Sequence, residues 1–300
     1  MPAQSRLSIA VVGPGAIGGT IAAWLSRSPR VGQVTLCARS PLDRLVVETP
    51  DGSVIESDPL VVTSPADITA PVDWVLVATK AYDGEAASAW FAGLVGPTTR
   101  IAVLQNGVEH VERFAPFVAP DRITPVVVDI PAERTGPGRI LHRREGTVIV
   151  PAGQAGDDFV ALFADSVIAA STTDDFPTVA WTKLALNCAG AVNALTGQPG
   201  GVVRAEGIAD LMRAMVRECV AVGRAVGAHL GDELPDWVVE RAMTSPPDSV
   251  NSLLGDRLAG RPMEWDARNG VIVRLGREHG IETPVNALCA TLLSATAWRP

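Results

Sequence analysis

Hydrophobic and polar residues follow two different patterns in the two halves of the chain. The first half contains short apolar runs, at residues 9–12, 33–39, 72–80 and 100–106, that end in glycine or polar residues. Such runs are typical of parallel strands that are buried on both faces. Beyond residue 177 the apolar positions recur with the 3.6-residue period of helices. The helical segments are predicted at residues 179–195, 208–230, 234–244, 263–280 and 284–298.

This division predicts an α/β fold, in which an N-terminal Rossmann-type doubly wound sheet is followed by an all-α C-terminal domain. We expect a hairpin around Asp51-Gly52, strands between residues 121 and 150 that complete the sheet, and a last helix over 157–171. A polar run with a proline then marks a boundary near 172–177. The predicted domains are therefore residues 1–172 and 173–300.

The first apolar run ends in glycines at the G-x-G-x-x-G spacing of a dinucleotide-binding turn, namely Gly13, Gly15 and Gly18. Gly13 permits a tight turn, Gly15 leaves room for a pyrophosphate, and Gly18 lets helix and strand pack closely. The phosphates would then lie at a helix N-terminus. A tight turn without ligand has the same glycines, but the preceding strand and the following helix favour nucleotide binding. The loop comprises Gly13, Pro14, Gly15, Ala16, Ile17 and Gly18.

Residues at the ends of the next strands refine the prediction of which cofactor binds. The second strand ends in CARS, which offers Arg39 where an NAD-specific fold needs a carboxylate for the ribose hydroxyl. NADP(H) is therefore the predicted cofactor, with Arg39 on its 2′-phosphate. Lys80 and Asn106 also follow strands, so we expect both to face the cofactor. Each has a simpler reading: Arg39 and Lys80 as solvated side chains, and Asn106-Gly107 as a turn.

The helical half contains two candidate positions for chemistry. Lys183 and Asn187 are four residues apart and share one face of an otherwise apolar helix. Glu264 stands at the start of another predicted helix. Taken alone, Lys183 could also be a lysine at a helix edge with its ammonium group in water. Glu264 could likewise be an acidic residue that stabilises the first turn of a helix.

The ordered set of motifs is more specific, because the chain resembles the ketopantoate reductase (2-dehydropantoate 2-reductase) family over nearly its whole length. The motifs are VVGPGAIGG, VATKAYD, LQNGVE, WTKLALNC, SVNSLLGDRLAGRPMEWDARNG and HGIETPVN. The resemblance implies NADPH-dependent reduction of 2-dehydropantoate to pantoate, on the route to pantothenate and coenzyme A. It also implies that Lys183 donates a proton, that Glu264 partners the cofactor and reacting centre, and that Asn187, Ser252 and Asn106 contact substrate. Lys80 and Asn106 would contact the cofactor.

One departure from the family pattern concerns the substrate. A second asparagine usually follows four residues after the first on the catalytic helix, but this chain has Ala191 there and Asn193 beyond it. Six residues turn an ideal helix by about 240°, away from the face of Asn187. Either a π-bulge or local unwinding brings Asn193 round as a substrate ligand, or the pocket lacks that ligand.

Composition limits the alternatives. The net charge of −8 favours no nucleic-acid partner, and no uninterrupted apolar run is long enough for a membrane span. Four scattered cysteines predict reduced thiols in the cytoplasm, and the four histidines form no cluster with metal-ligand spacing. A homodimer is possible, because apolar helices serve a core or an interface equally well. The alternatives to the predicted function are reduction of another small 2-oxo acid or imine, and a non-catalytic NADP-binding module.

Overall fold

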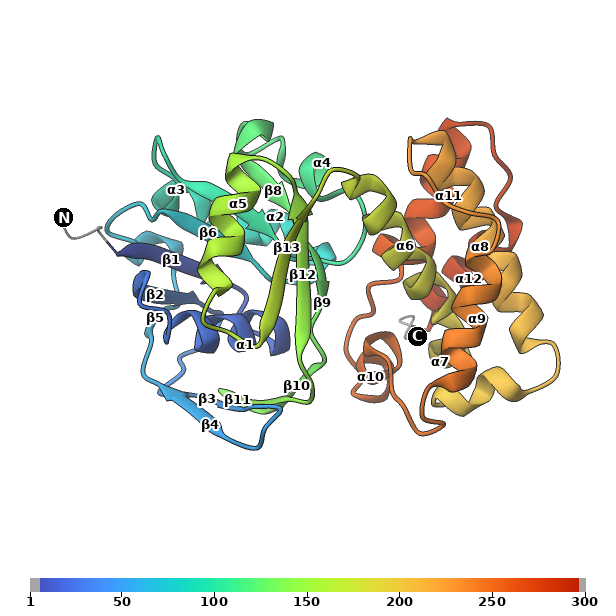
Figure 1. The fold of residues 1–300 in the computed structure, drawn as a ribbon, viewed down its shortest axis with the longest axis horizontal. Helices are drawn as coiled ribbons and strands as arrows, with labels where there is room; N and C mark the ends of the chain where they lie inside the picture. The colour runs from blue at the N-terminus through green and yellow to red at the C-terminus, as the bar shows by residue number, and fades with distance from the viewer. Residues whose placement is uncertain (1–5, 297–300) are drawn as a thin grey trace. The chain divides into compact units, whose positions relative to one another are not determined.

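A computed structural model describes residues 6–296 of the chain. The chain divides into two compact units near Phe176. A short segment, Asn106–Val108, lies within the first half of the sequence but belongs to the second unit. In Figure 1 the strands and short helices of the first unit run from blue to yellow-green, and the helices of the second unit run from yellow to red. None of the helices within residues 6–296 combines the length and apolarity needed to cross a lipid bilayer.

A six-stranded parallel sheet is the frame of the first unit. Its spatial order corresponds to the 3-2-1-4-5-6 order of dinucleotide-binding sheets, so the predicted doubly wound architecture is confirmed. In that order the strands are β5 (Leu60–Val62), β2 (Val31–Cys37), β1 (Leu7–Val12), β6 (Trp74–Val77), β7 (Arg100–Val103) and β8 (Ile123–Pro125).

Helices cover both faces of this sheet, as the uninterrupted apolar strands predict. Along β1, Ile9 and Val11 point into one core and Ala10 and Val12 into the other, because successive side chains in a strand alternate. The first core contains α1 (Ala16–Leu25) and α5 (Gln154–Val160), and the second contains α2 (Gly84–Ser88), α3 (Phe91–Leu94) and α4 (His110–Phe114). Single 3₁₀ turns are at Pro65–Asp67, Ala81–Asp83, Pro120–Arg122 and Ala161–Phe163.

Two smaller sheets complete the unit. The hairpin predicted around Asp51-Gly52 is confirmed, because β3 (Leu45–Glu48) and β4 (Val54–Ser57) pair antiparallel. The expectation that the strands after residue 121 complete the main sheet is wrong for all of them except β8. Instead β10 (Ala132–Gly136) and β11 (Arg139–His142) extend the hairpin, while β9 (Val127–Asp129), β12 (Gly146–Pro151) and β13 (Ile168–Thr173) form a third sheet.

The helix predicted over 157–171 is present only in its first part, and its extent is wrong. Helix α5 ends at Val160, and the residues from Ile168 onward form β13, which pairs in parallel with β12 along its whole length. Ala169 and Ala170 in β13 have helical propensity of their own. Pairing with a neighbouring strand overrides that local preference.

The second unit is helical, as predicted, but its helices are more interrupted than the periodicity suggests. The segment predicted as one helix over 179–195 breaks at Gly190, and the helix predicted from residue 263 begins later, with a π turn. The last residues of the helix predicted over 284–298 lie outside the described residues. The helices are α6 (Phe176–Ala189), α7 (Ala191–Thr196), α8 (Ile208–Ala225), α9 (Leu234–Thr244), α10 (Ser252–Leu258), α11 (Val271–Glu278) and α12 (Pro284–Ala295), with a 3₁₀ turn at Gly200–Arg204 and the π turn at Asp266–Gly270.

Candidate active site

The glycine turn between β1 and α1 has the geometry that its sequence predicts. Gly13 has a φ of +86°, and a Cβ there would lie 2.9 Å from the backbone nitrogen of Thr79. A Cβ on Gly18 would lie 2.5 Å from the carbonyl oxygen of Gly13 and 2.9 Å from the Cβ of Ala78. The tight turn and the close helix packing are therefore confirmed, since neither position has room for a larger residue.

The space around Gly15 is different. No atom beyond its chain neighbours lies within 4 Å of where its Cβ would be. Gly15 is also the N-cap of α1, where no side chain bonds the first turn and where that turn has no acidic residue. Pro14 lies in the turn before it, and Ala16 and Ile17 open the helix. The backbone N–H groups of this first turn thus remain suited to an anion.

The residues predicted at the strand ends lie past the carboxyl ends of their strands. Arg39 follows β2, is exposed, and makes no ion pair or side-chain hydrogen bond with another described residue. Lys80 follows β6 and is half-buried. These two positions belong to the same edge of a parallel sheet, where ligands of open α/β sheets bind.

Gln105, which was not among the predicted site residues, connects the ends of two strands. Its side-chain Nε2 donates to Thr79 Oγ1 at 2.8 Å and to the carbonyl oxygen of Lys80 at 3.1 Å. Its Oε1 accepts a hydrogen bond from Arg113 Nη1 at 2.8 Å, and its backbone oxygen accepts one from His110 Nε2 at 2.9 Å. Gln105 is buried, so these bonds fix the loops after β6 and β7. In the sequence, the one sign of this role was the position of Gln105 directly before the Asn106-Gly107 turn.

His110 is a buried histidine at the start of α4, directly after the loop that follows β7. Burial lowers its pKa to about 4, and the positive charge of Arg113 contributes in the same direction. The neutral ring donates to the Gln105 carbonyl through Nε2. His110 therefore acts as an uncharged support of the loop at neutral pH.

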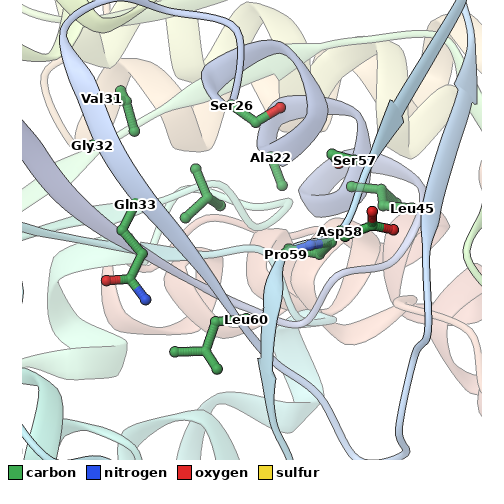
Figure 2. Close-up of a pocket in the computed structure, with 11 residues that line it drawn as sticks. Ala22, Ser26, Val31, Gly32, Gln33, Leu45, Ser57, Asp58, Pro59 and Leu60 are labelled. Carbon is green, nitrogen blue, oxygen red and sulfur yellow. The ribbon is translucent and has the colours of Figure 1, made fainter.

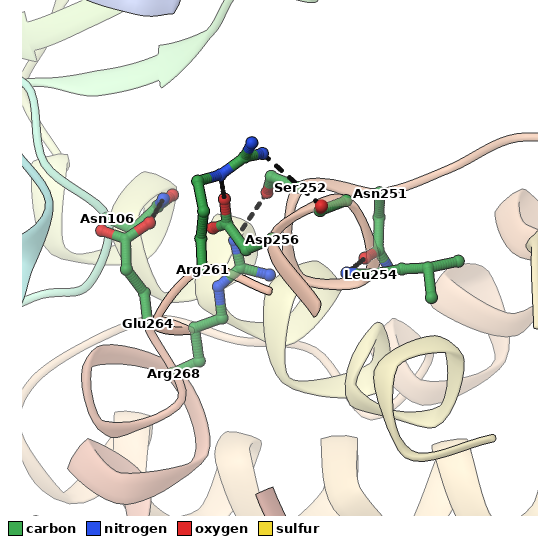
Figure 3. A network of polar contacts seen from close by, with 9 residues as sticks. Asn106, Asn251, Ser252, Leu254, Asp256, Arg261, Glu264 and Arg268 are labelled. Atoms are coloured by element: carbon green, nitrogen blue, oxygen red, sulfur yellow. Dashed lines mark hydrogen bonds and ion pairs between the residues drawn. The ribbon is translucent and has the colours of Figure 1, made fainter. Parts of the chain in front are cut away.

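A polar cluster in the second unit contains three of the predicted site residues. Asn106 Nδ2 donates to Glu264 Oε2 at 3.1 Å, and Asn187 Nδ2 donates to Asn106 Oδ1 at 3.4 Å. Glu264 is only 4% exposed, so this carboxylate is held away from bulk water. It precedes the π turn rather than standing in the first turn of a helix, which corrects the predicted placement. Figure 3 shows the Asn106 and Glu264 side chains meeting.

Lys183 and Asn187 lie on the same helix, α6, one turn apart. Both side chains are half-buried, while neighbouring Leu184 and Cys188 are packed in the helical core. The chain has two lysines, Lys80 and Lys183, beside 23 arginines. Both lysines lie in the motifs that identify the site. A lysine gives up its proton more readily than an arginine does.

Ser252 is the first residue of α10, directly after the N-cap Asn251. Its Oγ accepts a hydrogen bond from Arg268 Nη2 at 2.8 Å. Arg268 comes from the π turn and is 2% exposed. Arg268 could not be identified as a site residue from the sequence, because its position in the MEWDARNG motif says nothing about its burial.

The Asn193 side chain forms its hydrogen bonds with residues other than Asn187. The helix break at Gly190 is present, but the Asn193 side chain donates from Nδ2 to the carbonyl oxygen of Gln198 at 3.1 Å and accepts at Oδ1 from Asn251 Nδ2 at 3.0 Å. Asn251 Nδ2 also donates to the Gly190 carbonyl at 3.0 Å. The break is therefore stabilised by Asn251, and the Asn193 amide is engaged in local structure.

A cavity of about 460 Å³ lies elsewhere in the first unit (Figure 2). Its lining includes Ser26 near the end of α1, Gln33 near the start of β2, and Asp58 and Leu60 around β5. It thus adjoins the amino end of β2, opposite to the end that Arg39 follows, and none of the predicted site residues lines it.

Comparison with known proteins agrees with the motifs. The family model described as "Ketopantoate reductase PanE/ApbA" matches residues 9–155, and "Ketopantoate reductase PanE/ApbA C terminal" matches residues 175–297. A 2-dehydropantoate 2-reductase of Caulobacter vibrioides is 58% identical over 290 residues, which cover 97% of this chain and 99% of that protein. A 2-dehydropantoate 2-reductase of Mycobacterium tuberculosis is 39% identical over 297 residues, which cover 97% of this chain and 98% of that protein. The solved structure of a dimeric ketopantoate reductase from Staphylococcus aureus has a TM-score of 0.86 and 25% sequence identity, and the match covers 97% of this chain and 99% of that one.

Proposed function

Because the chain belongs to the ketopantoate reductase family, we propose that it reduces 2-dehydropantoate to pantoate with NADPH, in the biosynthesis of pantothenate and coenzyme A. The observation that carries the proposal at the level of residues is the bond from Asn106 to Glu264, joined by Asn187. All three are among the residues predicted to surround the reacting groups.

The residues of the first unit fit the cofactor. The tight turn at Gly13, the open space at Gly15 and the uncapped start of α1 suit a pyrophosphate. Arg39, exposed and without a carboxylate partner among residues 6–296, suits the 2′-phosphate that distinguishes NADP from NAD. We assign the whole loop from Gly13 to Gly18, Arg39, Lys80 and Asn106 to cofactor binding, and residues 1–172 to the cofactor-binding domain. Residues 173–300 form the proposed substrate and catalytic domain.

Bound NADPH supplies a hydride for the ketone carbon of the substrate. As the ketone oxygen becomes an alkoxide, an ammonium group stabilises the negative charge and provides the proton. We assign this role to Lys183. Glu264, a buried carboxylate that already accepts a bond from Asn106, would hold the charged lysine and the substrate hydroxyl in place. Asn106, Asn187 and Ser252 supply neutral hydrogen-bonding groups for the rest of the 2-oxo acid.

We propose that the replacement of the family asparagine by Ala191 bears on substrate choice. Since the Asn193 amide bonds to Gln198 and Asn251, we leave it out of the proposed substrate ligands. That difference motivates testing a panel of 2-oxo acids beside 2-dehydropantoate. We further propose a homodimer, by analogy with the dimeric relative, and a cytoplasmic location, which the four buried free thiols support.

The experiment follows NADPH absorbance with 2-dehydropantoate and with the panel. We expect 2-dehydropantoate to be preferred, and Lys183→Ala to lower kcat by about 10² to 10³ while the Kd for NADPH stays unchanged. Lys183→Arg is the matched control, because it keeps the positive charge but is a poor proton donor. Preference for another acid would overturn the substrate assignment. NADPH binding without turnover of any acid would support a non-catalytic module instead.

A further inference from the structure

Arg268 is a buried cation that the proposed mechanism does not use. It is 2% exposed, and its Nη2 donates to Ser252 Oγ at 2.8 Å, whereas Ser252 itself is exposed at the start of α10 (Figure 3). A guanidinium group carries only donors, so the Ser252 hydroxyl must be the acceptor in this bond. The hydroxyl hydrogen of Ser252 is consequently directed toward a different acceptor.

The surrounding carboxylates do not fully satisfy Arg268. Asp256 is ion-paired with Arg261 Nε at 3.0 Å, and Glu264 accepts a hydrogen bond from Asn106. The Nε of Arg268 is buried without an acceptor among the described residues. Burial lowers the pKa of Arg268, and the negative charges of Glu264 and Asp256 oppose that shift. A buried charge with incomplete pairing contributes poorly to stability, which favours a role in the site.

We propose that Arg268 is a positioning residue for substrate: it holds Ser252 as an obligate hydrogen-bond donor and adds positive charge behind it, so that Ser252 binds the carboxylate of the 2-oxo acid. This inference rests on the proposed function, which assigns Ser252 to substrate. It goes further by stating which residue sets the direction of the Ser252 hydroxyl. A carboxylate fits because it is an acceptor only and is negatively charged.

The test is a double-mutant cycle with Arg268→Met and Ser252→Ala, measured with 2-dehydropantoate. Arg268→Met should raise KM by about 10-fold or more, because a charge-assisted hydrogen bond is lost, with a smaller change in kcat and an unchanged Kd for NADPH. In the Ser252→Ala background the same substitution should change KM by less than about 2-fold. Arg268→Lys should recover part of the loss, since it keeps a charged donor.

Arg274→Met is the control for removing an arginine from the same region, because Arg274 forms a surface ion pair with Asp266. Thermal unfolding of each variant separates misfolding from weaker binding. Equal KM effects of Arg268→Met with and without Ser252, or no recovery by lysine in a folded variant, would overturn the role of Arg268. Wild-type turnover of 2-dehydropantoate tests the proposed function separately. If another acid is the substrate, the cycle is measured with that acid, and a wild type that reduces none overturns both proposals.

Discussion

Asn106 and Glu264 are 158 positions apart in the sequence, yet Asn106 Nδ2 lies 3.1 Å from Glu264 Oε2. Because the donor faces the carboxylate, the Asn106 oxygen is left to accept from Asn187. The Asn106 amide thus fixes the orientation of both the Glu264 carboxylate and the Asn187 amide. These bonds are among the contacts that attach the segment Asn106–Val108, which follows a strand of the first unit, to the helical unit.

Replacing Asn106 should damage the site through Glu264. Asn106→Ala removes a donor to a buried carboxylate, and we expect kcat/KM for 2-dehydropantoate to fall about 10-fold or more. Asn106→Asp should be more harmful at neutral pH, because two carboxylates would face each other. Lowering the pH should restore part of its activity, since a shared proton recreates the hydrogen bond. A pH profile of kcat/KM that is the same for both variants would contradict this account.

The glycine turn offers a matched pair of substitutions that add the same methyl group. Gly15→Ala meets no neighbouring atom within 4 Å, so the free energy of unfolding without cofactor should hardly change. The added Cβ does occupy the space proposed for the pyrophosphate, and the Kd for NADPH should rise about 10-fold or more. Gly18→Ala should instead lower the free energy of unfolding by about 1–3 kcal/mol, because its Cβ would press against the Gly13 carbonyl.

These two effects are measured by urea unfolding and by NADPH titration monitored by fluorescence. The contrast between the variants is the informative result. Comparable losses of stability in both would mean that the space at Gly15 is part of the packing. Normal NADPH binding by Gly15→Ala would mean that the cofactor does not approach this turn.

The parts of the fold that could be predicted from the sequence depend on local physics. Gly13 and Gly18 are required by backbone sterics within a few residues of each other, and the alternation of the buried strands is visible in their apolar runs. The strand β13 could not be predicted from its own residues, because pairing with β12 decides its conformation. The sequence left the break at Gly190 as one of two alternatives, because the break is stabilised by Asn251, which lies 61 positions further along the chain.

The candidate site shows the same limit. Motifs identify Lys183, Asn187 and Glu264, but they do not show which side chains bond to one another. Gln105 and Arg268 were missed for this reason. Gln105 matters through four hydrogen bonds to residues on both sides of it, and Arg268 through burial beside Ser252. Both properties arise only when separate segments meet.

Arg39 should determine the choice between NADPH and NADH. Arg39→Ala removes the charge proposed to bind the 2′-phosphate, so the Kd for NADPH should rise about 10-fold to 100-fold while that for NADH stays nearly unchanged. Arg44→Ala is the matched control, because Arg44 is also exposed but pairs with Glu56 and Asp58. Unaltered discrimination in Arg39→Ala would show that another residue binds the phosphate.

His110 should make the stability of the protein sensitive to mild acid. Its pKa is about 4 in the folded state because of burial, compared with about 6.5 for an exposed histidine. Above pH 6.5 the ring is neutral in both states and the shift has no effect. As the pH falls from 6.5 to 4, the unfolded chain binds a proton that the folded protein excludes, and this group lowers the free energy of unfolding by about 3 kcal/mol in total.

His110→Gln isolates this contribution from that of the carboxyl groups, because glutamine does not titrate and its amide can still donate to the Gln105 carbonyl. Urea unfolding of both proteins at pH 7.5, 6 and 4.5, chosen here to span about two pH units below the ordinary histidine pKa, gives the comparison. The wild type should lose more stability than the variant as the pH falls. Parallel losses would mean that His110 takes up its proton in the folded protein, and hence that the loop carrying Asn106 opens readily in acid.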